Sequence, residues 1–332
     1  MRVAVLMSGG IDSAVAALLL KEERHDVFGI HMVHIDRPNP KVFDLAERLR
    51  IPLKVVDVRG IFWGSVVRYF VEEYRRGRTP NPCYFCNRWI KFKYLFEVAD
   101  SLGADVLASG HYARVIDGKL YRAVDTSKDQ SYFLSSLNRE VLKRVIFPLG
   151  EMRKEEVRKL AESLGLEFDD ESQDVCFLKG KSLKEFLKGQ GLNPGRGEFI
   201  YRREVVGEHD GYAFYTIGQR KGLGISIGRR VYVIGLDPKR NLVYLGEKED
   251  VMYDMMTVSQ LNFLEDLEEE FESEVKIRSN FDPVPAEVKL EGDRAMVRLK
   301  EKVFAVTPGQ VAVFYRGDQV VLSGIIERGV RS

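Results

Sequence analysis

The chain has 332 residues, of which 45% are hydrophobic and 30% charged, and its formal net charge at pH 7 is +1. That length exceeds what a single hydrophobic core usually supports, so we expect two or three domains. No apolar run approaches the roughly 20 residues of a membrane span, and the N-terminus lacks the pattern of a secretory signal, so we expect a soluble, cytoplasmic protein without a membrane partner. Three cysteines are too few for a secreted disulfide framework.

Charge is distributed unevenly along the chain, which the near-neutral total hides. Residues 68–93 contain seven Lys or Arg and two Glu, net +5, whereas residues 241–275 contain one Lys and eleven acidic residues, net −10. Each run is compatible with a solvated helix or sheet face, and the basic run is also compatible with a surface that binds nucleic acid.

The N-terminal half alternates strand-like and helix-like segments. Residues 3–7 form an apolar run that ends at Ser8-Gly9-Gly10, and residues 12–20 have helical composition. A strand, a glycine turn and a helix in this order are typical of the start of a parallel α/β sheet. Further strands are predicted at 27–33, 53–58 and 105–109, helices at 42–49 and 63–74, and a hairpin turn at 117–118.

The pattern changes after the Asn-Pro-Gly sequence at 193–195. Residues 130–187 are mostly helical in pattern with a break at 169–176, whereas short alternating strands with glycine turns follow. We therefore predict three domains. They are an α/β domain with a helical extension over 1–192, a small central β domain over 193–255 and a C-terminal β-barrel domain over 256–332.

Residues 8–13, Ser-Gly-Gly-Ile-Asp-Ser, join the first strand to the first helix, where open α/β sheets bind ligands. Two glycines allow backbone N–H groups to point into one turn, and the helix N-terminus adds a partial positive charge, so the loop suits a pyrophosphate. It is not a Walker A loop, because it has no lysine that could reach a γ-phosphate. The alternative is a plain turn that Ser and Asp cap.

The loop resembles the PP loop of ATP pyrophosphatases, enzymes that transfer AMP to a carbonyl or carboxylate oxygen. The resemblance implies that ATP and magnesium are bound.

The cysteines lie in two segments of unusual composition, TPNPCYFCN at 79–87 and SQDVCF at 172–177. Cys86 precedes a cluster of cations formed by Arg88, Lys91 and Lys93. We expect these cations to lower the pKa of the Cys86 thiol and to make it a thiolate. Cys176 stands between Val and Phe, so a buried apolar role is the alternative for it.

Seven further strings extend the resemblance: TPNPxxxCNxxIKF from 79, SGHYAR from 109, KDQSYFL from 128, FPLG from 147, GEHDG from 207, TIGQRKGLGI from 216 and AVTPGQ from 305. Together with the phosphate loop they resemble the tRNA-specific 2-thiouridylase family, and they cover nearly the whole chain in order. The resemblance implies an adenine-nucleotide alpha-hydrolase-like α/β domain. It also implies an enzyme that adenylates the 2-carbonyl oxygen of the wobble uridine in tRNA and replaces that oxygen by sulfur.

Site residues follow from the resemblance position by position. ATP would be held by Leu6, Met7, Ser8, Gly9, Gly10, Ile11, Asp12, Ser13, Met32 and Gly110. The target base would face Asn81, Pro82 and Cys83, and tRNA would contact His111, Lys128, Asp129, Gln130, Arg278, Ser279 and Gln310. Cys176 would receive sulfur as a persulfide from a cysteine desulfurase or sulfur-relay protein. Cys86 would release that sulfur by forming a disulfide with Cys176, and the substrates would be the tRNAs for Lys, Glu and Gln.

One position departs from the family pattern. Many members have an aspartate, proposed as a catalytic acid, three residues before the partner cysteine, and this chain has Cys83 there. A third cysteine raises the alternative of a four-iron four-sulfur cluster with Cys83, Cys86 and Cys176 as ligands.

Two other functions remain compatible with the sequence. One is a PP-loop enzyme that adenylates a small molecule or a different tRNA base. The other is a non-catalytic RNA-binding module, which the intact polar residues of the loop disfavour.

Overall fold

The computed structural model describes residues 1–163, 165–166 and 175–331. Its N-terminal part is a parallel five-stranded sheet of order β3-β2-β1-β4-β7. Central strand β1 is apolar and almost entirely buried, as expected for a strand covered on both faces. The strands are β1 (Arg2–Leu6), β2 (Asp26–Val33), β3 (Leu53–Asp57), β4 (Val106–Ser109) and β7 (Val145–Ile146).

The strand order fixes where a ligand can bind. From β1 the chain adds β2 and β3 on one side and then returns to place β4 on the other side of β1. The carboxyl ends of β1 and β4 therefore lie at a topological switch point, where open α/β sheets form a ligand crevice. Helix α1 (Ile11–Glu22) begins at this edge directly after the glycine turn.

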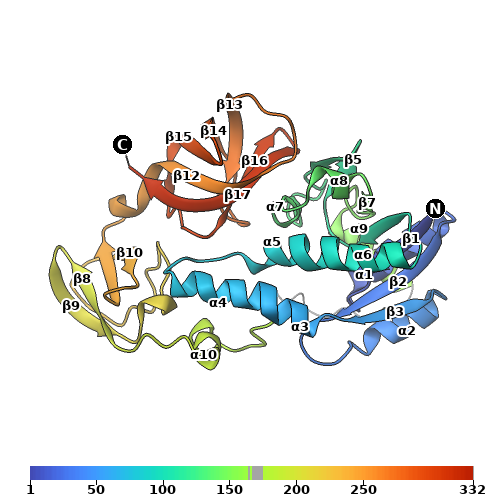
Figure 1. Ribbon diagram of the computed structural model, residues 1–332, viewed down its shortest axis with the longest axis horizontal. Helices are drawn as coiled ribbons and strands as arrows, with labels where there is room; N and C mark the ends of the chain where they lie inside the picture. The colour runs from blue at the N-terminus through green and yellow to red at the C-terminus, as the bar shows by residue number, and fades with distance from the viewer. Residues whose placement is uncertain (164, 167–174, 332) are drawn as a thin grey trace.

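Two long helical segments run side by side and connect the sheet to the β-rich parts (Figure 1). Each contains a π-helical stretch, η1 or η2, between two α-helical ones. The first consists of α3 (Arg59–Phe62), η1 (Trp63–Val67) and α4 (Arg68–Arg75). The second consists of α5 (Pro82–Cys86), η2 (Asn87–Tyr94) and α6 (Leu95–Ser101). The other described helices are α2 (Lys41–Arg48), α7 (Ser131–Leu134), α8 (Arg139–Leu142), α9 (Lys154–Ser163) and α10 (Leu183–Gly189).

A small central domain follows, with a four-stranded sheet of order β10-β11-β8-β9. The β8–β9 turn is formed by Arg202 and Arg203, both with positive φ, and the glycine-rich stretch lies between β9 and β10. The short 3-10 turns η3 (Tyr212–Phe214) and η4 (Glu249–Val251) flank the second pair of strands. The strands are β8 (Gly197–Tyr201), β9 (Glu204–His209), β10 (Tyr232–Asp237) and β11 (Leu242–Gly246).

The C-terminal part is a closed six-stranded antiparallel barrel of order β12-β15-β14-β13-β16-β17, which the β12–β17 pairing closes. Alternate residues of β14 and β15 point into its core, as the period of two requires. The strands are β12 (Met252–Phe263), β13 (Glu270–Lys276), β14 (Val284–Glu291), β15 (Arg294–Phe304), β16 (Val311–Arg316) and β17 (Gln319–Val330).

A hairpin of the α/β domain joins the edge of the barrel. Its strands are β5 (Arg114–Ile116) and β6 (Lys119–Tyr121), and β6 pairs with β17 at Gln319. The predicted turn at Asp117 and Gly118 is confirmed, and both residues have positive φ, 51° and 74°. This backbone matches the twist of the flanking strands.

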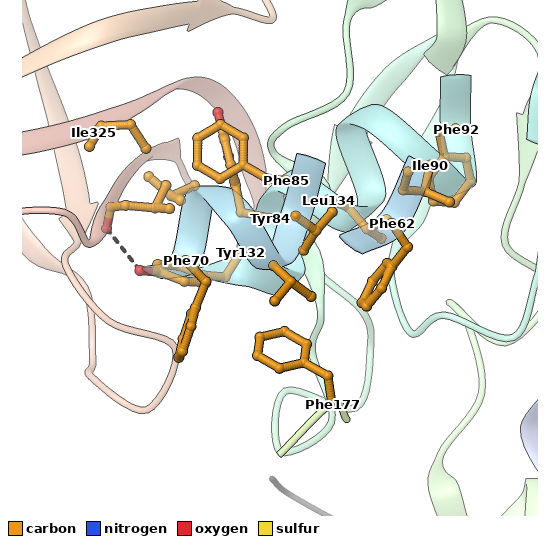
Figure 2. Packing of buried hydrophobic residues seen from close by; sticks show 14 of the residues in the cluster. Phe62, Phe70, Tyr84, Phe85, Ile90, Phe92, Tyr132, Leu134, Phe177 and Ile325 are labelled. Carbon is orange, nitrogen blue, oxygen red and sulfur yellow. Dashed lines mark hydrogen bonds between the residues drawn. The ribbon is translucent and has the colours of Figure 1, made fainter. Parts of the chain in front are cut away.

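The barrel also packs on the second long helix and on α7. Tyr84 OH lies 3.0 Å from Ser323 Oγ, and Tyr132 OH donates to the Val311 carbonyl at 2.8 Å. Figure 2 shows Tyr84 and Ile325 from these two parts of the chain in one buried cluster. The predicted fold class is confirmed. None of the described helices has the length and apolar character needed to cross a membrane.

Candidate active site

The predicted phosphate loop forms a tight turn that its own serine side chains hold. Ser13 Oγ accepts from the Ser8 N–H at 3.2 Å and donates to the Gly10 carbonyl at 2.9 Å, while Ser8 Oγ accepts from the Gly10 N–H at 3.3 Å. Gly10 is the N-cap of α1, so the first N–H groups of that helix face the turn. This arrangement suits an anionic oxygen.

Glycine is required at two positions around the loop. Gly9 has φ +91°, and a Cβ there would lie 2.3 Å from the Asn39 side chain, whose amide donates to the Ser8 carbonyl at 3.0 Å. A Cβ on Gly110, at the end of β4, would lie 2.6 Å from the backbone carbon of Asp12. The end of β4 and the start of α1 therefore approach each other more closely than any residue larger than glycine permits at position 110.

Asp12 makes an ion pair that the sequence did not predict. Lys154, the first residue of α9, donates to both carboxylate oxygens at 2.8 and 2.9 Å, and Tyr112 OH donates to one of them at 2.8 Å. Lys154 is only 5% exposed. The phosphate loop itself lacks a lysine, but the fold supplies one from a segment about 140 residues further along.

A cavity of about 260 Å³ opens at the switch point. Seven of the predicted ATP-binding residues line it: Leu6, Met7, Ser8, Asp12, Ser13, Met32 and Gly110. Two residues that were predicted to contact tRNA, His111 and Gln130, also line it. The sequence reasoning missed the remaining lining residues, which are Ile30, His31, His34, Lys91, Leu95 and Ser109. Gly9, Gly10 and Ile11 belong to the adjoining turn.

His111 lies between a serine and a lysine at the wall of this cavity. Its Nδ1 is 2.7 Å from Ser109 Oγ, and its Nε2 is 3.3 Å from Lys91 Nζ. Burial, together with the charge of Lys91, holds the pKa of His111 well below its ordinary value. The imidazole is therefore neutral, and Nε2 accepts from the ammonium while Nδ1–H donates to the serine.

The chain brings Cys176 close to the cysteines of the second long helix. Phe177 is 4% exposed, and its ring lies 5.0 Å from that of Phe70 and 6.0 Å from that of Phe62. Figure 2 shows these three rings gathered beside the helix that carries Tyr84. Cys176 itself is exposed, so its alternative reading as a buried apolar residue is wrong. Residues 172–174 of this segment lie outside the described residues.

The expectation of a Cys86 thiolate is wrong for the isolated protein. Burial in the surrounding chain raises the pKa of the Cys86 thiol to about 12, and Cys83 and Cys176 add to the rise. Of the three nearby cations, only Lys91 opposes that rise. Cys176 and Cys83 both reach the surface, but the chain atoms packed around them still keep water from most of each side chain. This desolvation, with the neighbouring thiol of Cys83, raises the pKa of Cys176 to about 11. Desolvation also raises the pKa of Cys83, against the charge of Lys91.

The remaining predicted residues have structural contacts of their own. Asn81 is 8% exposed and caps α5 by accepting from the Tyr84 N–H at 3.2 Å, with Pro82 as the first helical residue. Pro82 is buried. The Gln310 amide donates to the Thr79 carbonyl at 2.9 Å, which ties the barrel to the loop before α5.

The segment that holds Lys128, Asp129 and Gln130 forms the start of α7. The Asp129 carboxylate accepts from the Ser131 N–H, and the Gln130 side chain accepts from the Tyr112 N–H at 3.0 Å. Gln130 is the N-cap of α7, so these residues also have a structural role at the start of a helix.

Besides Gln310, two further predicted tRNA contacts lie in the barrel. Arg278 donates to the Ala305 carbonyl at 2.9 Å and to Thr307 Oγ1. Ser279 lies next to it and faces Asn280 at 3.5 Å. Arg278 is half-buried, and burial lowers its pKa.

A glycine turn at the switch point of a parallel sheet, a cavity beside it and an Asp–Lys pair at its edge define a nucleotide-binding α/β domain, here joined to two β domains. Residues 1–180 match the family model of the tRNA methyl transferase HUP domain, 184–247 its PRC-barrel domain and 253–326 the aminomethyltransferase beta-barrel domain. The chain belongs to the tRNA-specific 2-thiouridylase family.

Curated relatives match over their whole length. The tRNA-specific 2-thiouridylase MnmA of Aquifex aeolicus is 46% identical, with 100% of both chains covered. The protein of that name from Pseudothermotoga lettingae is 43% identical over 99% of both chains. The one from Carboxydothermus hydrogenoformans is 43% identical over 98% of both.

Proposed function

We propose that this chain adenylates the 2-carbonyl oxygen of the wobble uridine in tRNA and replaces that oxygen by sulfur. The observation that carries the proposal is the meeting of two chemistries at one place. Lys91 lines the cavity beside the phosphate-type turn, and its charge also acts on the three thiols. Adenylation supplies a good leaving group, and the thiols supply the sulfur nucleophile.

In the first step, the cavity residues would bind ATP and orient its α-phosphate. The turn of Ser8, Gly9 and Gly10 would hold the pyrophosphate with backbone N–H groups and hydroxyls. Lys154 would offset the charge that collects on the departing pyrophosphate, because it already lies 2.8 Å from Asp12 at the same edge. The uridine oxygen bonds to the α-phosphorus, and pyrophosphate leaves.

In the second step, a persulfide on Cys176 would attack C2 of the activated base, and AMP would leave with the electron pair of the C2–O bond. Cys86 would then attack the inner sulfur of that persulfide. The S–S bond breaks toward the base, 2-thiouridine is released, and a Cys86–Cys176 disulfide remains for a dithiol reductant to open. The persulfide itself would come from a cysteine desulfurase or a sulfur-relay protein.

Magnesium would reach the site with ATP. Asp12 lines the cavity, and its side chain is 31% exposed, so one carboxylate oxygen can contact a metal. Across residues 1–163, 165–166 and 175–331 there is no group of three or more His, Cys, Asp or Glu side chains that could hold a metal ion. Phosphate oxygens and water would therefore supply most of the ligands, as is usual for this ion.

The iron–sulfur alternative concerns the same three cysteines, Cys83, Cys86 and Cys176, whose thiols act on one another electrostatically. The persulfide route needs two of these thiols, whereas a cluster would need all three. Iron and sulfide assays after anaerobic purification test the persulfide route, since an active protein without iron supports the persulfide and an iron-dependent one contradicts it.

The tRNA partner would contact both the α/β domain and the barrel. Gln310 and Arg278 of the barrel, with Asn81, Pro82 and Cys83 at the start of α5, surround the entrance to the three thiols in this proposal. The basic run at 68–93 would contact phosphates, so affinity should fall as salt rises. The tRNAs for Lys, Glu and Gln are the expected substrates, and the cytoplasm remains the expected location.

The test is direct. Unmodified tRNA is incubated with the protein, ATP, magnesium and a persulfide donor, and its nucleosides are analysed by mass spectrometry. We expect 2-thiouridine and one pyrophosphate per thiolated tRNA. Cys176→Ala should release pyrophosphate without thiolation, and Asp12→Ala should do neither while it still binds tRNA. Unmodified tRNA from the wild-type reaction, or wild-type thiolation by Cys176→Ala, would contradict the proposal.

A further inference from the structure

Lys91 lines the cavity and also acts electrostatically on the cysteines. It lines the cavity with Ser8 and Met32, and its Nζ lies 3.3 Å from His111 Nε2. Its charge also acts on the thiols of Cys83, Cys86 and Cys176, and no other Lys or Arg of the described chain acts on all three.

The π-helix η2 explains how Lys91 reaches this place. An α-helix has 3.6 residues per turn, so five residues would rotate Lys91 about 140° past Cys86 and point it elsewhere. In a π-helix each residue instead pairs with the fifth one along, so five residues exceed one turn by less and Lys91 lies nearer to the face that carries Cys86, the N-cap of η2. The wider turn thus brings the ammonium of Lys91 and the thiol of Cys86 toward the same side of the helical segment.

Among the described residues, no carboxylate balances the positive charge of Lys91. Throughout the described residues, no Asp or Glu oxygen lies within 4.0 Å of its Nζ. Its neighbour is the neutral imidazole of His111, which accepts a hydrogen bond and leaves the charge intact. A half-buried cation that a neutral group orients toward a cavity is complementary to an anionic ligand.

We propose that Lys91 is a catalytic residue that contacts the anionic groups on both sides of the substitution at C2, the phosphate of the adenylated uridine and the terminal sulfur of the Cys176 persulfide. The inference rests on the proposed function. His111 is its positioning residue. From the sequence, Lys91 was expected only to share with Arg88 and Lys93 in lowering the pKa of the Cys86 thiol, and no contact with substrate was expected of it.

Charge moves past Lys91 during this step. The terminal sulfur gives up its negative charge as it bonds to C2, and AMP gains that charge as the C2–O bond breaks. The ammonium remains close to the charge in both positions, which lowers the energy of the state between them. It also offsets the loss of the general acid that many family members carry at the position of Cys83.

The experiment compares wild-type protein with Lys91→Met, Lys91→Arg and Lys159→Met. Lys159 is an exposed lysine on α9 and controls for the loss of one charge. Single-turnover formation of 2-thiouridine is measured with saturating tRNA and persulfide-loaded protein. We expect Lys91→Met to lower the rate about 100-fold, the usual effect of removing one stabilising donor, with tRNA affinity and thermal midpoint near wild type. Lys91→Arg should recover part of the rate because it keeps the charge.

A second measurement separates this inference from the proposed function. Iodoacetamide labelling of Cys86 and Cys176 needs no tRNA, and Lys91→Met should slow it several-fold while Lys159→Met leaves it unchanged. A wild-type protein that makes no 2-thiouridine but shows this labelling difference defeats the proposed function and keeps the contact between Lys91 and the thiols. A Lys91→Met protein that thiolates at the wild-type rate with saturating tRNA overturns the inference.

Discussion

The thiols of Cys86 and Cys176 lie where their protons are held more tightly than in water. Burial is the main cause, and the neighbouring thiols contribute to both shifts. A resting enzyme with protonated thiols is protected from oxidation, because the thiolate is the form that oxidants attack. When the reaction takes place, the bound substrate or the charge of Lys91 then has to favour the thiolate form of these cysteines.

We predict that alkylation of Cys86 keeps increasing with pH beyond about 9, where an ordinary cysteine has already levelled off. The pKa of about 12 for Cys86 and of about 11 for Cys176 give the direction. Because the folded chain binds these protons more tightly, the free energy of unfolding should also fall as pH rises from about 9 toward 12. Peptide mapping after iodoacetamide treatment checks the first effect, and denaturant titration the second. A Cys86 labelling rate that levels off near neutral pH would contradict the assignment.

Residue roles were predictable where a local string carries the chemistry, as in the loop at 8–13. Lys154 was missed because it begins an unremarkable helical segment, and only the sheet topology brings it to Asp12. The pKa of Cys86 was predicted with the wrong sign, because sequence shows the nearby cations but not the burial that outweighs them.

At the scale of elements, the site depends on how closely the end of β4 approaches the start of α1. Gly110 permits this approach, since a Cβ there would meet three backbone atoms of Asp12 and Ser13 at 2.6 to 2.8 Å. Backbone atoms cannot rotate away as a flexible side chain can. Strand and helix would have to separate, and the loop between them would change shape.

Gly110→Ala should therefore lower the free energy of unfolding by about 1–3 kcal/mol, the typical cost of overpacking, and should also weaken ATP binding. Gly60→Ala is the matched control, because a Cβ at Gly60 in α3 meets nothing within 4 Å. That change should stabilise the protein by about 0.5–1 kcal/mol through helix propensity. Denaturant titration and calorimetric titration with ATP measure both effects. Equal stabilities for the two variants would show that the approach is not tight.

Most strands and helices of the N-terminal half were predictable from apolar runs and glycine turns. The π-helices were not, because their i to i+5 pairing leaves no distinct mark on the spacing of apolar residues in so short a stretch. The position of Lys91 relative to Cys86 along this helical segment was therefore not predictable either.

At the scale of the whole molecule, one buried core runs from the α/β domain through the central domain into the barrel. It includes Phe70, Phe199 and Ile325, one from each part. Asn262 of β12 adds a polar contact, since its amide donates to the carbonyls of Ser135 and Leu137 at 2.8 Å each. The barrel should therefore not unfold independently of the catalytic part.

Asn262→Leu removes both bonds. The Leu137 carbonyl then lacks this donor, whereas the Ser135 carbonyl still accepts from Ser323 Oγ, so the change should cost about 1–3 kcal/mol in unfolding free energy. Asn280→Ala, at an exposed position of the same barrel, should change it by less than about 0.5 kcal/mol. Thermal unfolding followed by near- and far-UV circular dichroism should show one coincident transition for the wild type. A separate early transition in the wild type would mean that the parts are thermodynamically independent.

The order of the three parts and the C-terminal barrel were predictable from the change in residue pattern along the chain, whereas the pair of strands that closes the barrel was not. Closure depends on the β12–β17 pairing, and its register is set by contacts between residues that are far apart in sequence. The domain boundaries themselves remain predictions.

Strand β17 gives the molecule a particular order of assembly during translation. It is the last of the described strands and pairs with β12, β16 and β6. These three strands therefore lack one of their partners until β17 has been synthesised. Until then, the hydroxyl of Tyr84 lacks Ser323, which is synthesised 239 residues later. A nascent chain can thus complete its nucleotide pocket early, but the barrel contacts that support the helix with Cys83 and Cys86 form only after β17 has been synthesised.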